Sequence, residues 1–379
     1  MPIAESQRLR IPSHYYVYSE PPDKTGEEVL HFVSPHRRVK LRGRSFREFV
    51  QHVQPLLDGR HSFEEIHAEV SDLFEPEDLA ACFDVLSENG LLEDAAQSTL
   101  APEVEERLRP QLNLFHDLAP EGARLQERLA AARVSVFGLT GAGAVAASSL
   151  AAAGIGTVRC IDDGPVTAAD TYFSAAFELT DTGSARCDAM CRRVRRSAPQ
   201  VRYEAVPDRL PDDDAVERAI AGSHFVVNCV DEGNISLVYK LNRVCLKLRI
   251  PWISAAASGL EVIVGPAVYP GETACYMCYR MRLVACADKP EAEFDFQSYL
   301  DRRKRDDSSR HANLVFGVGI AGQLAALEAV KALSGAGQPA TRGKLQIIDL
   351  RDLSSSRHVV LRKPWCPACF ADWDSGGQE

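Results

Sequence analysis

Two Cys-x-x-Cys pairs are the residues of this chain whose type and spacing point most directly to chemistry. Cys275 and Cys278 lie in ACYMCYR, and Cys366 and Cys369 lie in WCPACF. Four thiolates suit one tetrahedral Zn²⁺ ion, and four protein ligands leave no coordination position open for a substrate. The spacing therefore predicts a closed structural zinc site that fastens the C-terminal tail. The alternative, redox or catalytic use of these thiols, is disfavoured by the closed ligand set.

A glycine-rich turn between a predicted strand and a predicted helix is the second candidate site. The strand covers residues 134–138, and the turn GLTGAG contains Gly138, Gly141 and Gly143. Backbone N–H groups in such a turn, together with the helix N-terminus, attract an anion such as a phosphate. Asp162 or Asp163, about twenty residues further on, is placed to hold a ribose hydroxyl. The alternative is that the glycines only let the helix pack closely on the strand.

The segments around this turn predict an α/β domain over residues 132–379. TVRCIDD, VRYEAV, HFVVNCVD, PWISAAA and LEVIVGPAV read as strands that alternate with helices. This alternation is typical of a Rossmann-like, doubly wound and mainly parallel sheet. The polar, densely charged residues 290–311 are predicted to form a mobile insertion, because such a composition buries little apolar surface.

The first part of the chain has a different pattern. HYYVY, VLHFV and RVKLR are three short β-rich runs, and three amphipathic helical segments follow them. Three strands followed by three helices predict a winged helix-turn-helix domain over residues 1–94. Residues 95–131 are charged and helix-prone, and we interpret them as a linker helix.

Composition limits the classes of function. The net charge of −10 argues against a nucleic-acid-binding protein. No run of eighteen apolar residues and no apolar segment behind a basic start is present, so the sequence predicts a cytoplasmic protein without a membrane partner. Seven of the eleven cysteines lie outside the two pairs, scattered in apolar or helical contexts, as in a reducing compartment.

The order and spacing of the motifs over residues 112–370 resemble the ThiF/MoeB/HesA family, the bacterial relatives of ubiquitin-activating enzymes. The similar segments are VFGLTGAGAVAASSLAAAGIGTVRCIDDGPV, VVNCVDEGN, CYMC, GVGIAGQLAALEAVKALSG and CPAC. The resemblance implies binding of ATP, adenylation of a peptide or protein carboxylate, and a homodimer. By position it assigns Gly138, Gly141 and Gly143 to the phosphate loop, Asp162 to the ribose, Arg186 to the family's basic residue and Asp231 to the magnesium side.

Departures from this family pattern affect the nucleotide site. Thr140 replaces a loop glycine, and its Cβ narrows the approach of a phosphate to the backbone. Phe173 stands where the family has one arginine, and Leu114 falls where gapless counting places a second. No cysteine precedes GVGIAG at the family's thioester position. Because phosphoryl-type chemistry depends on neutralising charge, we expect a degenerate domain that does not adenylate, with ATP and Mg²⁺ binding vestigial or lost.

The N-terminal domain is similar to the PqqD-like recognition element that binds leader peptides of ribosomally made natural products, where the leader adds a strand to the sheet and contacts the third helix. An exposed sheet edge can pair with an extended peptide in this way. The peptide-binding residues expected here lie on the third strand and third helix: Arg38, Val39, Lys40, Leu41, Arg42, Leu79, Phe83 and Leu86. A DNA-binding winged helix is disfavoured because the helix SFEEIHAEVSDL is acidic. The basic residues are alternatively a solvated strand face.

The combination of both domains resembles the ocin-ThiF-like leader-binding partners of YcaO cyclodehydratases. It implies that the chain captures a precursor peptide and delivers it to a separate YcaO enzyme, which forms azoline rings. The alternative is a peptide adenylyltransferase of the microcin C7 or pantocin type. A sulfur-carrier activator is disfavoured because it has no use for a leader-binding domain.

Overall fold

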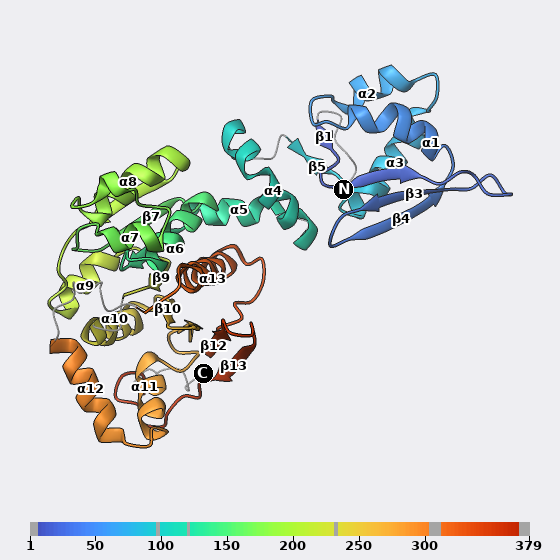
Figure 1. Ribbon diagram of the computed structural model, residues 1–379. Helices are drawn as coiled ribbons and strands as arrows, with labels where there is room; N and C mark the ends of the chain where they lie inside the picture. The colour runs from blue at the N-terminus through green and yellow to red at the C-terminus, as the bar shows by residue number, and fades with distance from the viewer. Residues whose placement is uncertain (1–6, 96–98, 120–121, 231–233, 303–311, 371–379) are drawn as a thin grey trace. The chain divides into compact units, whose positions relative to one another are not determined.

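The computed structural model describes residues 7–95, 99–119, 122–230, 234–302 and 312–370 (Figure 1). The chain forms two compact units, Met1–Glu127 and Arg128–Glu379. Each unit has its own sheet, and each is described by itself.

The N-terminal unit contains a three-stranded antiparallel sheet in the order β2-β3-β4. Its strands are β2 (Tyr16–Ser19), β3 (Glu28–Val33) and β4 (Arg38–Gly43). A short two-stranded sheet pairs β1 (Leu9–Arg10) with β5 (Glu93–Asp94). The helical segments are α1 (Phe46–Glu48), η1 (Phe49–Val53), η2 (Gln54–Leu56), α2 (Phe63–Val70) and α3 (Pro76–Glu88). Three strands thus precede three helical regions, in the predicted order.

Local sequence signals explain where these helices begin and end. Ser62 and Glu65 form a reciprocal capping box at the start of α2, with a 2.7 Å bond from the Ser62 N–H to Glu65 Oε2. α3 ends at Glu88 with Asn89 as its C-cap, and Gly90 follows with a φ of 59° that favours glycine. The apolar faces of the helices and of β3 then meet in one core, which includes Leu30, Phe32, Phe49, Val53, Ile66, Leu79, Phe83 and Leu86.

The predicted linker region forms two helices, α4 (Pro102–Leu118) and α5 (Gly122–Ala131). A Cβ on Gly122 would lie 2.5 Å from the backbone nitrogen of His116, so the start of α5 approaches α4 too closely for any other residue. α4 belongs to the N-terminal unit. The structure therefore has two helices in the region 95–131, where a single linker helix was predicted.

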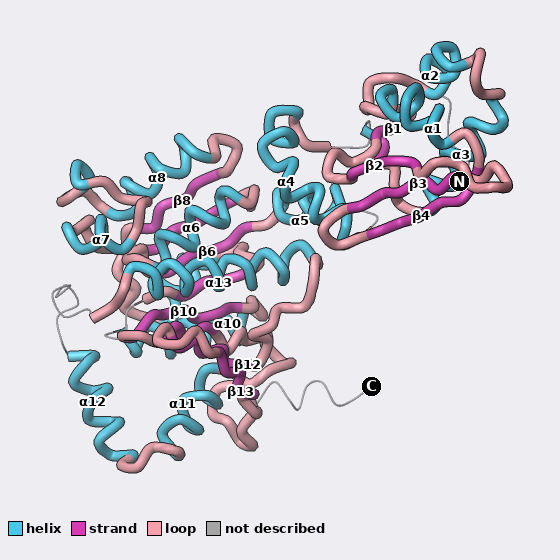
Figure 2. The backbone as a smooth tube through the Cα atoms, turned by 45° about the vertical axis from the view of Figure 1, so that its right-hand side comes forward, coloured by secondary structure: helices cyan, strands magenta, loops and turns pink. Residues whose placement is uncertain are grey.

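The C-terminal unit is built on an eight-stranded sheet in the order β13-β12-β11-β10-β9-β6-β7-β8 (Figure 2). Five neighbouring strands are parallel: β6 (Arg133–Phe137), β7 (Thr157–Ile161), β8 (Arg202–Val206), β9 (Phe225–Asn228) and β10 (Trp252–Ser258). The helices between them are α6 (Ala142–Ala152), α7 (Ala168–Phe173), η4 (Leu179–Asp181), α8 (Arg186–Ser197), α9 (Asp213–Ile220) and α10 (Ile235–Leu248). The prediction of a mostly parallel, Rossmann-like α/β sheet is confirmed.

The remaining strands correct one part of that prediction. β11 (Glu261–Val264), β12 (Lys344–Asp349) and β13 (Ser355–Val359) extend the sheet in antiparallel pairs. LEVIVGPAV therefore does not continue the alternation of strand and helix. Gly259, at φ 60°, lies in the tight turn that reverses the chain after β10.

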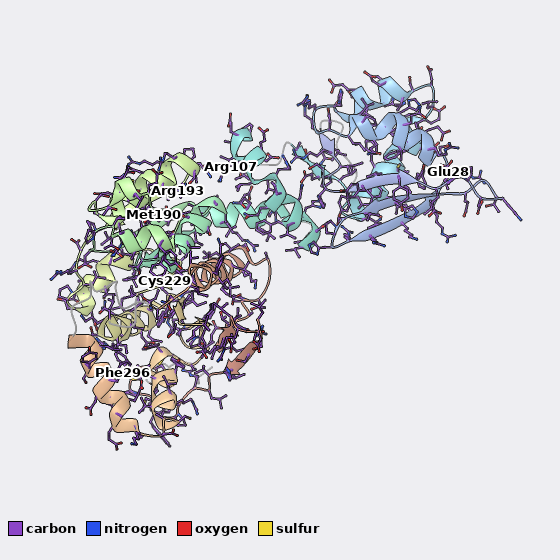
Figure 3. All side chains as sticks on the ribbon, viewed as in Figure 1. Glu28, Arg107, Met190, Arg193, Cys229 and Phe296 are labelled. Atoms are coloured by element: carbon purple, nitrogen blue, oxygen red, sulfur yellow. The ribbon has the colours of Figure 1, made fainter. Side chains whose placement is uncertain are left out.

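The charged residues predicted as a mobile insertion contain a helix, α12 (Pro290–Arg302), which follows α11 (Tyr276–Ala285). Glu293 accepts a 3.1 Å ion-pair hydrogen bond from Arg280, and Leu300 is buried. The ion pair and the buried leucine hold the helix despite its charged composition, whereas Phe294 and Tyr299 are exposed. Phe296 lies exposed on the same helix (Figure 3). Residues 303–311 lie outside the described part of the chain.

Helix α13 (Val315–Ser334) lies against α6 and against strands β9, β10 and β11. Small residues bring α13 and α6 close together, since a Cβ on Gly322 would lie 2.3 Å from the Ala142 carbonyl oxygen. Among the described residues, α13 is the one helix long and apolar enough to cross a membrane by length and composition. The core helix of a soluble protein passes the same test, and the position of α13 on the sheet is that of a core helix.

Candidate functional site

The glycine-rich turn follows β6 where the strand order reverses, between β7 on one side and β9 on the other. Ligands of such sheets bind beyond the carboxyl ends of the strands at this point. Gly138 and Gly141 have φ values of 74° and 42°. A Cβ on Gly143 would lie 1.7 Å from the Gly138 carbonyl oxygen and 3.3 Å from the Cβ of Cys229, which follows β9 (Figure 3). The packing itself therefore requires glycine at Gly143, whether or not a phosphate binds.

This packing gives a first testable expectation. Gly143→Ala should lower the free energy of unfolding by about 1–3 kcal/mol, as overpacking of a close contact does. Urea unfolding followed by circular dichroism measures the loss. Gly319→Ala on α13 is the matched control, because nothing lies within 4 Å of its added Cβ and alanine favours a helix. An unchanged urea midpoint for Gly143→Ala would show that the turn relaxes freely.

Asp162 and Arg186 meet beside the turn. The Leu139 N–H donates to Asp162 Oδ2 at 2.6 Å, and the Gly164 N–H donates to Asp162 Oδ1 at 2.8 Å. Arg186, at the start of α8, donates to Asp162 Oδ1 at 3.2 Å and to Asp170 Oδ2 at 3.0 Å. The predicted ribose acid is thus held rigidly against the glycine turn by a buried arginine.

Burial and charge act in opposite directions on Arg186. Burial alone lowers the pKa of its guanidinium, but the carboxylates of Asp162 and Asp170 outweigh burial, so the net pKa is raised. Asp170 is itself 2% exposed. The three side chains therefore form a buried charged network in which removing one member leaves another without its partner.

Asp170 is a partner of Arg186 that was not predicted from the sequence. Its signal was the T-x-x-D pattern that starts α7: Asp170 Oδ2 accepts from the Thr167 N–H at 2.7 Å and from the Thr167 hydroxyl at 2.9 Å. This capping box fixes the carboxylate where Arg186 reaches it. Asp231, the predicted magnesium-side acid, lies outside the described residues.

Thr140, Phe173 and Leu114 are the three positions where the sequence departs from the family pattern of the nucleotide site. A Cβ on Gly141 would lie 2.4 Å from Val318 Cγ1 and 3.3 Å from the Cβ of Phe173, so two apolar side chains border the turn. Thr140 is partly buried within the turn. Leu114 lies on α4 of the N-terminal unit and is 40% exposed.

The four paired cysteines gather in one buried cluster. Sγ–Sγ distances are 3.9 Å for Cys275–Cys278, 3.7 Å for Cys275–Cys366 and 3.6 Å for Cys278–Cys369. Ligands at the Zn–S distance of about 2.3 Å stand about 3.8 Å apart at the corners of a tetrahedron. Hydrogen bonds from the Cys275 and Cys369 thiols lower the pKa of Cys278, and the Lys363 N–H donates to its sulfur at 3.3 Å. The donor set and spacing fit a tetrahedral metal ion.

The predicted peptide-binding residues divide into two groups. Arg38, Lys40 and Arg42 are exposed on β4, while Val39 and Leu41 are partly buried against the core. Leu79, Phe83 and Leu86 are at most 1% exposed. These three therefore build the core of the N-terminal unit and are not open to a peptide; the exposed side of α3 carries Val85, which is 43% exposed.

The end of α3 is tied to the start of β4. The guanidinium of Arg37, the residue before β4, donates to the carbonyl oxygens of Asn89 and Gly90, the two residues that follow α3. One basic side chain therefore fixes the strand edge relative to the helix.

The mostly parallel sheet, the glycine turn at its switch point and the Cys₄ cluster define a Rossmann-like α/β protein with a glycine-rich loop. The model of the ThiF family matches residues 108–368, and the chain belongs to the ThiF family. It is 30% identical over 258 residues to the sulfur carrier protein ThiS adenylyltransferase of Escherichia coli K12, covering 68% of this chain and 92% of that protein. It is 30% identical over 244 residues to the molybdopterin-synthase adenylyltransferase of Salmonella typhimurium, covering 64% and 89%.

Solved structures extend the similarity of fold over nearly the whole chain. The microcin C7 biosynthetic enzyme MccB in complex with N-formylated MccA superposes with a TM-score of 0.66 at 17% identity, covering 95% of this chain and 99% of that one. E. coli MccB with ATP gives 0.65 at 16% identity with the same coverage. PaaA gives 0.66 at 22% identity, covering 92% and 99%. Because the curated relatives are adenylyltransferases by name, the comparisons give no support to the expectation that ATP binding is lost.

Proposed function

We propose that this chain captures a precursor peptide along β4 of its N-terminal winged-helix unit and delivers it, in the cytoplasm, to a YcaO cyclodehydratase that forms azoline rings. The observation that carries the proposal is the free edge of β4, one of the two outer strands of the three-stranded sheet. β4 pairs with β3 on one side, and no strand among the described residues pairs with its other side. An unpaired edge offers N–H and C=O groups to an extended peptide.

The side chains around this edge define what kind of peptide fits. Arg38, Lys40 and Arg42 project from one face of β4 in an otherwise acidic chain of net charge −10. Val39 and Leu41 lie on the other face with part of their surface open. A leader with acidic residues and alternate apolar anchors complements both faces. Exposed Val85 on α3 supplies a further apolar contact.

The structural comparison supports a peptide partner. MccB, which has been solved in complex with the peptide MccA, aligns with 95% of this chain, including its N-terminal unit. A bound leader raises the local concentration of the attached core peptide at the partner enzyme. Delivery needs no chemistry in the ThiF-type domain, and Phe173 and Val318 at the glycine turn are consistent with a domain that has stopped adenylating.

We assign Zn²⁺ to the Cys₄ cluster because the sulfur spacing suits it. A homodimer is also proposed, since exposed apolar residues at and along α13, namely Leu314, Phe316 and Leu327, offer a surface for a second copy.

An ATP-dependent peptide adenylyltransferase is the second candidate. The buried Asp162–Arg186–Asp170 network favours it, because these side chains keep the predicted ribose acid fixed at the turn. The names of the curated relatives favour it as well. The two functions differ in which protein consumes ATP.

Reconstitution with a YcaO enzyme and the precursor peptide encoded near this gene separates the candidates. Mass spectrometry counts the water molecules lost from the peptide, and a coupled assay follows pyrophosphate. We expect ring formation at low peptide concentration to rise roughly 10²-fold when the chain is added, with no pyrophosphate released by the chain alone. Pyrophosphate release from chain, peptide and ATP without the YcaO enzyme would establish the adenylyltransferase instead.

A further inference from the structure

Three potential metal ligands meet inside the N-terminal unit, far in sequence from the cysteine cluster. His14 precedes β2, while His116 and Asp117 lie in the last turn of α4. One ring nitrogen of each histidine and one carboxylate oxygen of Asp117 all lie within 4.8 Å of one another. The fold therefore brings together residues about a hundred positions apart whose side chains are common ligands of zinc.

The geometry is close to that of a shared ion. His14 Nε2 lies 2.9 Å from Asp117 Oδ1, which is a hydrogen-bond distance. Two ligands of one tetrahedral ion stand about 3.3–3.6 Å apart at bond lengths of about 2.0–2.2 Å, so this pair has to open by about half an ångström to hold an ion. The imidazole rings of His14 and His116 have centroids 6.0 Å apart and are nearly perpendicular, at 68°. Two rings bound to one ion through single nitrogens reach this distance.

One ring nitrogen of the cluster is left for an ion to bind. The Nδ1 atom of His116 is buried and has no hydrogen-bond partner, whereas His14 faces Asp117 through Nε2. His116 is 5% exposed, so solvent has little access to its Nδ1 atom. A buried imidazole nitrogen without a partner is costly unless something binds it.

The carboxylate of Asp117 is oriented by its neighbours. The Ser34 hydroxyl donates to Oδ2 at 2.6 Å, and the Tyr15 hydroxyl donates to Oδ1 at 3.0 Å. Hydrogen bonds of this kind hold metal-ligating groups in place. Glu93 and Arg37 contribute opposite charges around His116.

We propose that His14, His116 and Asp117 bind one divalent transition-metal ion of the Zn²⁺ type, at a site separate from the Cys₄ cluster. Two imidazoles and a carboxylate match the ligand preference of Zn²⁺ and leave a fourth position for water. The ion would fasten the segment before β2 to the end of α4, and so fix the base of the peptide-binding sheet. The alternative is that Asp117 serves only as a hydrogen-bond acceptor for His14, Tyr15 and Ser34.

Zinc stoichiometry of the full-length chain tests the site. The protein is equilibrated with Zn²⁺ buffered at a low free concentration, and bound zinc is measured by inductively coupled plasma mass spectrometry. We expect two zinc ions per chain for the wild type and one for both His116→Gln and Asp117→Asn. His61→Gln is the matched control and should retain two, because His61 pairs with Asp58 at the surface of the same unit.

One zinc ion per wild-type chain would overturn the proposal, and so would two ions in His116→Gln and Asp117→Asn. Co²⁺ titration of the wild type gives a second test that does not depend on whether these variants fold. The equivalent of Co²⁺ that the Cys₄ cluster binds produces sulfur-to-cobalt charge-transfer bands. The equivalent that the histidine and aspartate ligands bind should add only weaker ligand-field bands. If Co²⁺ binding saturated after the single equivalent that the Cys₄ cluster binds, the proposal would also be overturned.

Discussion

Removal of metal from the Cys₄ cluster should abolish cooperative unfolding of the C-terminal unit. Metal binding and folding are coupled, and structural zinc contributes about 10–16 kcal/mol in zinc-finger peptides at pH 7. Cys275 faces Cys366 and Cys278 faces Cys369, in segments 91 residues apart. Without the ion, these segments lose the bonds that join them. Thermal unfolding followed by circular dichroism, with and without a strong zinc chelator, measures the effect.

Single substitutions give the matched comparison. Cys369→Ser should reproduce much of the loss caused by the chelator. Cys286→Ser should not, because Cys286 is exposed and lies outside the cluster. If the chelated protein and Cys369→Ser unfolded at the wild-type midpoint, the four thiols would not form a structural metal site.

Arg186→Met should lower the free energy of unfolding by about 3–5 kcal/mol, the usual cost of breaking a buried ion pair. The substitution leaves the carboxylates of Asp162 and Asp170 without their cation, at positions where each is almost fully buried. Urea unfolding monitored by circular dichroism measures the change.

Arg192→Met on the same helix is the control. Arg192 pairs with Asp181, but its side chain is 51% exposed, so its loss should cost about 0–1 kcal/mol. Equal destabilisation by the two substitutions would contradict the account, because it would mean that Arg186 contributes no more than a surface charge. Asp170→Asn combined with Arg186→Met should cost less than the sum of the two single changes.

Local patterns in the sequence were sufficient for several parts of the molecule. The strand, glycine turn and helix at residues 134–152 are specified by short-range requirements, such as the positive φ of Gly138 and the close contact at Gly143. The two Cys-x-x-Cys pairs likewise predicted a four-sulfur cluster. Each pair brings two sulfur ligands together locally, and the two pairs together supply the four ligands of one tetrahedral ion.

Long-range geometry explains the errors. The direction of β11 depends on the turn at Gly259, whereas an apolar run reads the same for parallel and antiparallel strands. The order of α12 was missed because its overall charge concealed the ion pair of Glu293 and the buried Leu300 that hold it. Leu79, Phe83 and Leu86 were assigned to a peptide although their spacing on α3 is that of a core-facing stripe. The juxtaposition of His14 with Asp117 depends on how α4 lies within the N-terminal unit, which no local pattern encodes.

Calorimetric titration of the full-length protein with the leader peptide tests the central claim most directly. The account predicts saturable one-to-one binding that weakens about tenfold or more in Lys40→Glu/Arg42→Glu, since each exposed charge pair contributes about 0.2–1 kcal/mol and reversal adds repulsion. Arg60→Glu, an exposed reversal elsewhere in the same unit, should bind as the wild type does. Leader binding that is absent, or equal in all three proteins, would contradict capture of the peptide along β4.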